Sequence, residues 1–575
     1  MRRVILFIAL ISLCQLALAQ GTLKFNVQVT GLEEPLSTNA VARLNAIQKP
    51  VKDNLTPDII QKLFQKGTKE IRLAIQPFGY FKPSITKKLT SKNNVWTAYY
   101  YVNPGPPLHI TTLHINIIGP GAHNQQLQQL LQKLRRKTGK IFSTKLYNNI
   151  TNRLLEKAQE NGYLRATFSK NQIIINQHQY TCAITLVFDT GPRYYFGLVT
   201  FSPSPLANSF LHRYVEFDSK TPFSYTKLID LKDRLSGSGY FSSVTSVTNH
   251  KNPKQKHIPV RINLKMNKNK AYKFGIGYGT VSGPRATIGF NWRWLNRTGD
   301  KLNLYTRVSA TERNLVAQYI IPGKHPAKEQ YAITGGIYKI TPQQGESFMQ
   351  SLGVSYIRHY ARWQQTISLE GQNEHYRVLD GQPKYHAKML VPTISISHLT
   401  TNKIIDTSRG NRFTFTIRGA SEDILSNVSF IQAIVKDKFI YTIWQDNRIV
   451  LRGRLGYTAG KKTAQLPVSK QFYTGGIDSV RGFGYNYLGP GKYLAVGSAE
   501  LQRRIYKKIY GAVFYDKGNA MNKWDNMNLV HSYGVGIVWQ TQLGALQIYV
   551  ARASDENNRK NKHHYRLEFS LGPDL

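Results

Sequence analysis

A glycine-rich stretch over residues 475–485 holds an arginine whose surroundings suggest a specific interaction. The stretch reads Gly-Gly-Ile-Asp-Ser-Val-Arg-Gly-Phe-Gly-Tyr, so Arg481 stands among small and aromatic residues. A guanidinium group keeps its charge and offers a planar set of donors that matches carboxylates and aromatic faces. Gly482 next to it permits close backbone approach. Taken alone, the tetrapeptide Val-Arg-Gly-Phe favours the plainer interpretation of an exposed loop charge, and the rest of the chain must decide.

Motifs for catalysis, metal binding or cofactor binding are missing from the sequence. Gly275, Gly277 and Gly279 are spaced like a phosphate loop, but no helix is expected after them. No Gly-x-Ser-x-Gly elbow and no His-Glu-x-x-His helix occurs. His250 and His257 flank a lysine-rich turn, where solvated imidazoles are expected. We therefore predict no catalytic residue, no metal site and no cofactor.

The first 19 residues have the pattern of an export signal. Two arginines precede an apolar run that closes on Ala-Leu-Ala-Gln, so we expect a signal peptide over residues 1–19 with cleavage after Ala19. Cys14 leaves with that peptide, and Cys182 is then without a cysteine partner, which excludes an intrachain disulfide. No later run approaches the roughly 20 apolar residues of a transmembrane helix.

The charge balance is extreme, with 77 Lys and Arg against 32 Asp and Glu and a formal net charge of +45. Nucleic acid is the usual partner of such a chain, but export and the even spread of the bases argue against it. Anionic lipid headgroups, acidic clients and a general basic bias of the source proteome all stay open as explanations. The 34 tyrosines and 44 glycines favour a β-barrel with aromatic girdles over a soluble enzyme.

A glycine followed by a hydrophobic or aromatic pair recurs at Gly79, Gly162 and Gly239, a period of about 80 residues that indicates repeated domains. An amphipathic helix precedes each glycine, and alternating strands begin and end each unit. Pro- and Gly-containing turns separate the units. The prediction is three small modules, each with two helices on a sheet, over residues 20–104, 105–190 and 191–268.

After residue 268 the helical pattern gives way to strict alternation. Tyr533, Val535 and Ile537, for example, alternate with small residues, and in the last strand apolar residues alternate with Arg566 and Glu568. Charged residues on the inner side and apolar residues outside are typical of a barrel with a polar lumen. An assumed 16 strands leave about 19 residues for each strand and its connection. We predict an antiparallel transmembrane β-barrel over residues 269–575, with a soluble β-sandwich as the alternative.

In this order the segments resemble the outer-membrane assembly factor superfamily and, over the mature chain, its TamA family, the outer-membrane subunits of the translocation and assembly module. The three modules resemble POTRA domains; related families have five or typically two. The residues that carry the resemblance are Gly277-Tyr278, Gly283-Pro284-Arg285, Gly475-Gly476, Ser479-Val480-Arg481-Gly482, Glu500, the run Gly511-Ala512-Val513-Phe514-Tyr515-Asp516-Lys517-Gly518, and Leu571-Gly572-Pro573-Asp574-Leu575.

The resemblance implies two sites. In the first, the Arg481 loop folds into the barrel lumen and locks against the inner wall, where Arg481 contacts Asp516 and Glu500. In the second, the first and last barrel strands form a lateral gate for client strands; three glycines on one face of the first strand independently predict a loose seam. The lock residues are Arg481, Gly482, Phe483, Asp516, Glu500 and Gly518. The gate residues are Phe274, Gly275, Gly277, Tyr278, Phe569 and Gly572.

The resemblance also implies a location, a function and partners. The barrel would lie in the outer membrane of a Gram-negative bacterium with the POTRA modules in the periplasm. It would insert and secrete autotransporter and β-barrel clients without enzymatic activity. Its implied partner is the inner-membrane-anchored TamB, contacted through the POTRA region, besides client polypeptides and outer-membrane lipids. An envelope lipid-transport component and a secretion pore for one substrate are the alternatives.

Overall fold

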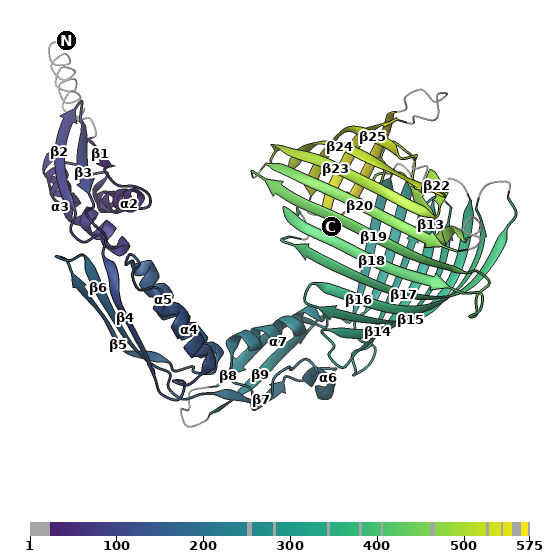
Figure 1. Ribbon diagram of the computed structural model, residues 1–575, viewed down its shortest axis with the longest axis horizontal. Coiled ribbons are helices and arrows are strands. Elements are labelled where there is room, and N and C mark those ends of the chain that lie inside the picture. Colours follow the sequence, from purple (N-terminus) through teal and green to yellow (C-terminus); the bar gives the residue numbers. More distant parts are fainter. Residues whose placement is uncertain are drawn as a thin grey trace, which may run out of the picture. The chain divides into compact units, whose positions relative to one another are not determined.

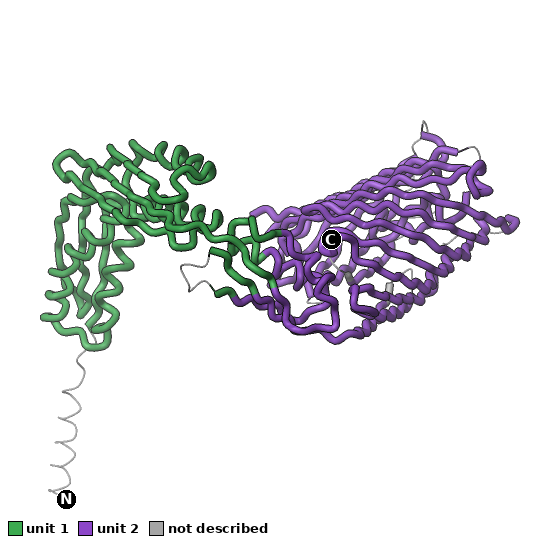
Figure 2. The backbone as a smooth tube through the Cα atoms, turned by 90° about the horizontal axis from the view of Figure 1, so that it is seen from below, with its two compact units in different colours: residues 1–199, 217–229, 248–260 green, residues 200–216, 230–247, 261–575 purple. Residues whose placement is uncertain are grey.

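The computed structural model divides the chain into two compact units (Figure 2). One contains residues 1–199, 217–229 and 248–260, and the other contains residues 200–216, 230–247 and 261–575, so the division runs through the third module. The predicted signal peptide lies outside the described residues. The structure describes residues 23–249, 256–279, 283–341, 345–378, 382–403, 406–444, 446–460, 466–524, 528–541, 544–554 and 565–572.

Three modules of one design precede the barrel (Figure 1). Each has a three-stranded sheet in which the last strand of the module lies in the middle. The first comprises β1 (Lys24–Thr30), α2 (Leu36–Gln48), η1 (Lys49–Val51), α3 (Pro57–Ile75), η2 (Gln76–Phe78), β2 (Ser84–Lys92) and β3 (Val95–Asn103). The second comprises β4 (His109–Ile118), α4 (Gln125–Arg135), α5 (Thr144–Glu160), β5 (Thr167–Asn176) and β6 (Thr181–Asp189). The third comprises β7 (Tyr195–Phe201), α6 (Asn208–His212), α7 (Tyr225–Gly237), β8 (Phe241–Thr248) and β9 (His257–Met266).

Side-chain caps fix where the module helices begin. The Thr56 hydroxyl accepts a hydrogen bond from the third residue of α3, and Pro57 occupies the first helical position, where its missing N–H costs nothing. Ser143 caps α5 in the same way, with 3.1 Å between its Oγ and the Leu146 nitrogen. The buried stripe of α5 then packs on the sheet of the second module, as the spacing of its apolar residues predicts.

The three repeated glycines have one conformational role. Gly79, Gly162 and Gly239 have φ of +96°, +90° and +81°, a region that side chains with a Cβ rarely adopt. The carbonyls of Gly79 and Gly162 each accept a backbone hydrogen bond from the start of the following module, at 2.9 and 2.7 Å. The period seen in the sequence therefore marks the turn from the last helix of each module to its second strand.

The barrel is a 16-stranded sheet in which every strand pairs antiparallel with its neighbour in the order of the barrel (Figure 1). The predicted fold class, POTRA-like modules followed by an antiparallel barrel of 16 strands, is confirmed. None of the helices in the described part of the chain is both long and apolar enough to span a membrane. The first eight barrel strands are β10 (Lys270–Gly279), β11 (Gly283–Trp292), β12 (Lys301–Val308), β13 (Glu312–Pro322), β14 (Glu329–Ile340), β15 (Glu346–Tyr360), β16 (Trp363–Arg377) and β17 (Tyr385–Thr401). The other eight are β18 (Arg409–Ala420), β19 (Phe430–Ile443), β20 (Asn447–Ala459), β23 (Tyr493–Tyr506), β24 (Ile509–Met521), β25 (Val530–Thr541), β26 (Gly544–Ser554) and β27 (Tyr565–Gly572).

Side chains alternate across the barrel wall as the sequence predicts. On β25, Tyr533, Val535 and Ile537 are exposed on the outside, whereas Ser532, on the opposite parity just before them, is buried. Glu568 of β27 is likewise buried, between the exposed Leu567 and the half-buried Phe569. Apolar side chains therefore face outward and polar ones face the lumen, which is what a lipid environment requires.

The two ends of the barrel sheet are β10 and β27. Within residues 270–279 and 565–572 no strand ladder joins them, although every other neighbouring pair in the barrel is joined by one. The barrel is thus nearly closed, with a seam between its first and last strands.

Candidate functional site

The connection between β20 and β23 folds into the barrel. Residues 466–492 of this connection contain η4 (Val468–Lys470), β21 (Phe472–Thr474) and β22 (Leu488–Gly491), and the two strands pair with each other. Val480 and Phe483 pack with Phe472 and with apolar side chains of β23 and β24. We call residues 466–492 the lumen loop. This small apolar core, together with the pairing of β21 and β22, holds the loop in one conformation.

Arg481 lies at the centre of the lumen loop and is fully buried. Its Nε and Nη2 donate to the two oxygens of Asp516 on β24, at 2.9 and 2.8 Å, and its backbone N–H donates to the same carboxylate at 3.0 Å. Its Nη1 donates to Glu500 on β23 at 2.6 Å, and Nη2 also reaches the Ser498 hydroxyl at 3.1 Å. Both carboxylates that were expected to meet Arg481 are therefore in contact with it. A fork-shaped donor and a carboxylate in this arrangement form one of the stronger hydrogen-bonded pairs in proteins.

Two aromatic rings cover the faces of the guanidinium group. Its carbon lies 3.5 Å from the ring centre of Phe514 on β24 and 4.6 Å from that of Tyr549 on β26. The Tyr549 hydroxyl donates to Glu500 at 2.6 Å. The rings shield the charge from water and contribute a cation–π attraction, which increases when the cation is desolvated.

A second arginine, on the barrel wall, balances the charges around Arg481. Arg452 on β20 donates to Glu500 at 3.3 Å and to the carbonyl of Ile477 in the lumen loop at 3.2 Å. Two arginines thus face two carboxylates, Asp516 and Glu500, all nearly free of solvent. Such a network contributes little net free energy of folding, but removing one member strongly destabilises the protein, because it leaves a buried charge without its partner. It therefore specifies where the loop sits.

Gly482 allows the loop to lie directly on the wall. A Cβ at this position would be 2.8 Å from the Ala553 backbone and 2.8 Å from the Ser532 side chain, closer than real Cβ contacts. Gly475 and Gly476 have φ of +114° and +90°, which turns the chain into the motif. Backbone geometry thus favours glycine at Gly475 and Gly476, and close approach to the wall favours it at Gly482.

Two predicted lock residues have positions away from the charges. Phe483 packs in the apolar core of the lumen loop. Gly518 lies on β24, where a Cβ would come within 2.6 Å of the Ala495 carbonyl on the neighbouring strand. Four further contact residues, Arg452, Ser498, Phe514 and Tyr549, were not predicted from the sequence. Strand parity could have identified Ser498 and Phe514, because each shares the inward face of its strand with Glu500 or Asp516. Arg452 and Tyr549 lie on β20 and β26, which carry no predicted lock residue.

A second anchor holds the first residues of the lumen loop on other strands of the barrel. Glu374 of β16 is completely buried and accepts hydrogen bonds from the Ser469 nitrogen at 3.1 Å and the Ser469 hydroxyl at 2.5 Å. Ser347 of β15 donates to the same carboxylate at 2.8 Å. Gln432 of β19 donates to the carbonyl of Lys470 at 2.7 Å. The loop is therefore fixed at two points, on β23–β24 and on β15–β19.

The predicted seam residues lie on β10 and β27. Phe274 projects outward and is highly exposed, while Gly275 and Gly277 occupy the inward face of β10. Phe569 is half-buried on β27. Tyr278 and Gly572 belong to these strands, but their side chains lie outside the described residues. The structure brings the two predicted groups of gate residues to the two edges of the sheet.

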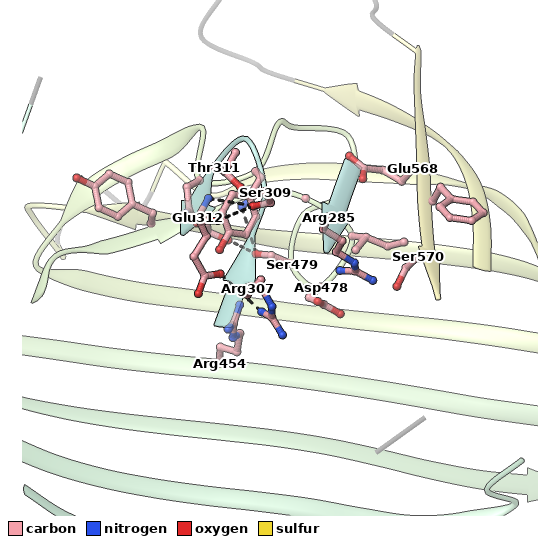
Figure 3. A pocket seen from close by; sticks show the side chains of 18 residues that line it. Arg285, Arg307, Ser309, Thr311, Glu312, Arg454, Asp478, Ser479, Glu568 and Ser570 are labelled. Atoms are coloured by element: carbon pink, nitrogen blue, oxygen red, sulfur yellow. Dashed lines mark hydrogen bonds and ion pairs between the residues drawn. The ribbon is translucent and has the colours of Figure 1, made fainter. Parts of the chain in front are cut away.

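A polar cavity of about 370 Å³ lies inside the barrel beside the seam (Figure 3). Its walls come from β11, β12, β13, β20, the lumen loop and β27. The charged side chains that line it are Arg285, Arg307, Glu312, Arg454, Asp478 and Glu568. The seam and the lumen loop thus share one internal space. Within the described residues no group of three or more His, Cys, Asp or Glu side chains could hold a metal ion.

Comparison with protein families gives two matches. A model described as the Omp85 superfamily domain matches residues 223–574. A second, described as POTRA domain TamA domain 1, matches residues 26–104.

Individual relatives are similar over shorter stretches. The outer membrane protein assembly factor BamA of Nitratidesulfovibrio vulgaris is 25% identical over 161 residues, 25% of this chain and 20% of that protein. The chloroplastic outer envelope protein 80 of Oryza sativa subsp. japonica is 27% identical over 189 residues, 30% of this chain and 26% of that protein. The matches thus span about a quarter or less of these relatives.

Solved structures show the same fold over most of the chain. The crystal structure of BamA from Haemophilus ducreyi lacking POTRA domains 1–3 has a TM-score of 0.63 at 17% identity, covering 80% of this chain and 99% of that one. CdiB from Acinetobacter baumannii has a TM-score of 0.50 at 12% identity, covering 94% of this chain and 99% of that one.

Proposed function

Because the chain belongs to the Omp85 superfamily, we propose that it inserts and secretes autotransporter and β-barrel clients by pairing their strands at its own seam. Its barrel lies in the outer membrane of a Gram-negative bacterium and its POTRA modules lie in the periplasm. The activity is assembly and transport, without a chemical reaction. Energy comes from client folding, in which strand pairing replaces exposed strand edges.

One observation carries this proposal: in the described residues of the first and last barrel strands, 270–279 and 565–572, no ladder joins the two. An unpaired strand edge presents N–H and C=O groups that accept another strand. On the outside of β10, Phe274 and Ile276 are 77% and 93% exposed, so a strand added to this edge would continue the lipid-facing apolar surface. A client hairpin entering there meets hydrogen-bond partners and lipid at the same time.

The lumen loop supports the seam in this account. Its Arg481 lock fixes the loop on β23 and β24, and the loop in turn forms part of the cavity wall beside β27. The lock residues Arg481, Asp516 and Glu500 therefore hold the inner surface past which a client strand enters. We assign them a positioning role.

Within the superfamily we propose that the chain acts as a TamA-type subunit. The match of residues 26–104 to the first POTRA domain of TamA supports this, as does the presence of three modules before the barrel. The partner in that case is the inner-membrane-anchored TamB, contacted by the POTRA modules. The modules are the periplasmic part of the chain, and a partner anchored in the inner membrane would meet them there.

A depletion experiment separates this function from its alternatives. Cells depleted of the protein should lose autotransporters from their surface, while the lipid composition of the outer membrane stays normal. Altered envelope lipid with normal autotransporters would instead identify a lipid-transport component. Loss of a single secreted protein, with all other outer-membrane proteins intact, would identify a secretion pore for one substrate. Pull-down of TamB by the full chain but not by a variant lacking residues 23–104 would test the partner.

A further inference from the structure

Arg285 starts on β11 but its side chain crosses the neighbouring strand. Its Nη2 donates to the main-chain carbonyl of Leu571 on β27 at 3.3 Å, so it spans β10 and reaches the opposite side of the seam. Figure 3 shows Arg285 beside Ser570 at the edge of the cavity. This hydrogen bond joins the first strands of the barrel to the last one across the seam.

The glycine on β10 opposite Arg285 makes this path possible. Gly277 is the register partner of Arg285, and a Cβ there would lie 2.8 Å from Arg285 Nε and 3.3 Å from its Cγ. Any larger residue would therefore push the arginine off the strand. Gly275 differs, because a Cβ there would be 3.4 Å from Thr287 Oγ1, an ordinary contact. The inward face of β10 thus leaves room at Gly277 for the Arg285 side chain. We call this space over Gly277 the Gly277 track.

The carbonyl that Arg285 meets belongs to a strand edge. Leu571 lies opposite Leu546 of β26, and its other side faces the seam, where no ladder supplies a donor within the described strands. A main-chain carbonyl withdrawn from water needs a hydrogen-bond donor. A guanidinium group provides one with a charge, which strengthens the bond.

We propose that Arg285 is a strand-recognition residue: it lies in the Gly277 track and binds a main-chain carbonyl of whichever strand occupies the edge of β10. In the resting barrel that strand is β27. During insertion it is the client strand, and this second half rests on the proposed function. The ligand is the main chain of an extended polypeptide, so recognition does not depend on the client's side chains. A residue that binds carbonyls in this way holds the seam shut and is released to the client as β27 departs.

The resting contact is tested by the distance across the seam. Spin labels are placed on cysteines at Ile276 and Leu567, which both point outward, and the full chain is reconstituted in phospholipid vesicles. Cys182 stays unlabelled because it is buried, and burial raises the pKa of its thiol to about 11. Pulsed electron paramagnetic resonance then gives the distances between the two labels and so the ratio of open to closed seams. Folding of each variant is checked by the heat-dependent gel mobility of the barrel.

Arg285→Ala removes a charge-assisted hydrogen bond and should raise the open-to-closed ratio by about tenfold or more. Gly277→Ala should do the same, because its methyl group displaces the arginine, and it should add nothing in the Arg285→Ala background. Gly275→Ala and Arg307→Ala are the matched controls; Arg307 lines the same cavity but pairs with Glu312 at 3.6 Å, and neither change should move the ratio. Unchanged distances in folded Arg285→Ala and Gly277→Ala, or equal opening in Gly275→Ala, would overturn the proposal.

The client half is tested with a peptide of the β27 sequence, residues 565–572, that carries a photo-cross-linker. It should cross-link to β10 in the wild-type chain and about tenfold less in Arg285→Ala, with Arg307→Ala unchanged. Equal yield in Arg285→Ala would show that the arginine does not bind the incoming strand. If the peptide does not reach β10 of the wild-type chain, strand pairing at the seam is wrong, and with it the client half, while the distance measurement still decides the resting contact.

Discussion

Replacing Arg481 with alanine should strongly destabilise the barrel. The substitution removes four side-chain hydrogen bonds and leaves Asp516 and Glu500 facing one arginine instead of two, in a site closed to solvent. Breaking a buried ion pair by deleting one partner costs about 3–5 kcal/mol. Asp516→Ala should cost a similar amount, because it leaves Arg481 buried without its bidentate partner.

The double variant makes this prediction quantitative. Removing Arg481 and Asp516 together takes away one charge of each sign and leaves Arg452 paired with Glu500 at 3.3 Å. The double change should therefore cost less than the sum of the two single changes, by about 2 kcal/mol or more, within the range seen for contacting residues. The measurement is equilibrium unfolding in urea with the full chain in lipid vesicles, followed by tryptophan fluorescence.

Arg307→Ala serves as the control for this series. Arg307 is also in the lumen, but it and its partner Glu312 are well exposed, so its loss should cost less than about 1 kcal/mol. Additive costs in the double variant, or a silent Arg481→Ala beside a crippling Asp516→Ala, would refute the reasoning that these two residues form the contact that holds the loop.

Three further outcomes follow from other contacts. Gly482→Ala should cost about 1–3 kcal/mol in the same unfolding assay, because its methyl group overlaps the backbone of β26; a neutral effect would mean that the loop does not rest on the wall there. Glu374→Gln should weaken the second anchor by about 1–3 kcal/mol, since an amide cannot accept all the hydrogen bonds from Ser469, and protease cleavage within the lumen loop should then accelerate. Acidification should loosen the turn that carries Lys328. Partial burial raises the pKa of Glu216, but the hydrogen bond from Lys328 and the positive charges of Arg234, Lys328 and His325 together outweigh it and hold that pKa below its usual range. The stabilisation is therefore present above the ordinary carboxyl pKa and is lost as the pH falls through the lowered one, which hydrogen exchange of that turn would report.

Much of the architecture could be predicted because it depends on local sequence patterns. Alternation of side chains identifies barrel strands one at a time, and a positive φ demands glycine at Gly79, Gly162 and Gly239, so the module period is visible in the sequence. The contact of Arg481 with Asp516 and Glu500 came from the family resemblance, and the structure shows the atoms that make it.

The contacts that could not be predicted join segments far apart in sequence, which meet only because the sheet curves into a barrel around the lumen loop. Ser469 and Glu374 belong to segments far apart in sequence, and no motif marks either, so the second anchor is visible only once the loop is inside the barrel. The same holds for Tyr549, which reaches Arg481 from a strand two places from the one that carries Asp516. Gly277 was assigned to a weakened strand, whereas its surroundings give it a specific neighbour, the Arg285 side chain.

The central claim is that client strands pair at the seam, and a cross-linking measurement on assembling cells tests it most directly. A photo-reactive residue is placed at Phe274 or Ile276 of β10 while an autotransporter is being assembled. We expect covalent adducts to one strand of the client. We also expect that a disulfide between cysteines placed on β10 and β27 abolishes both the adducts and surface display. Full client assembly with the seam locked shut would contradict it.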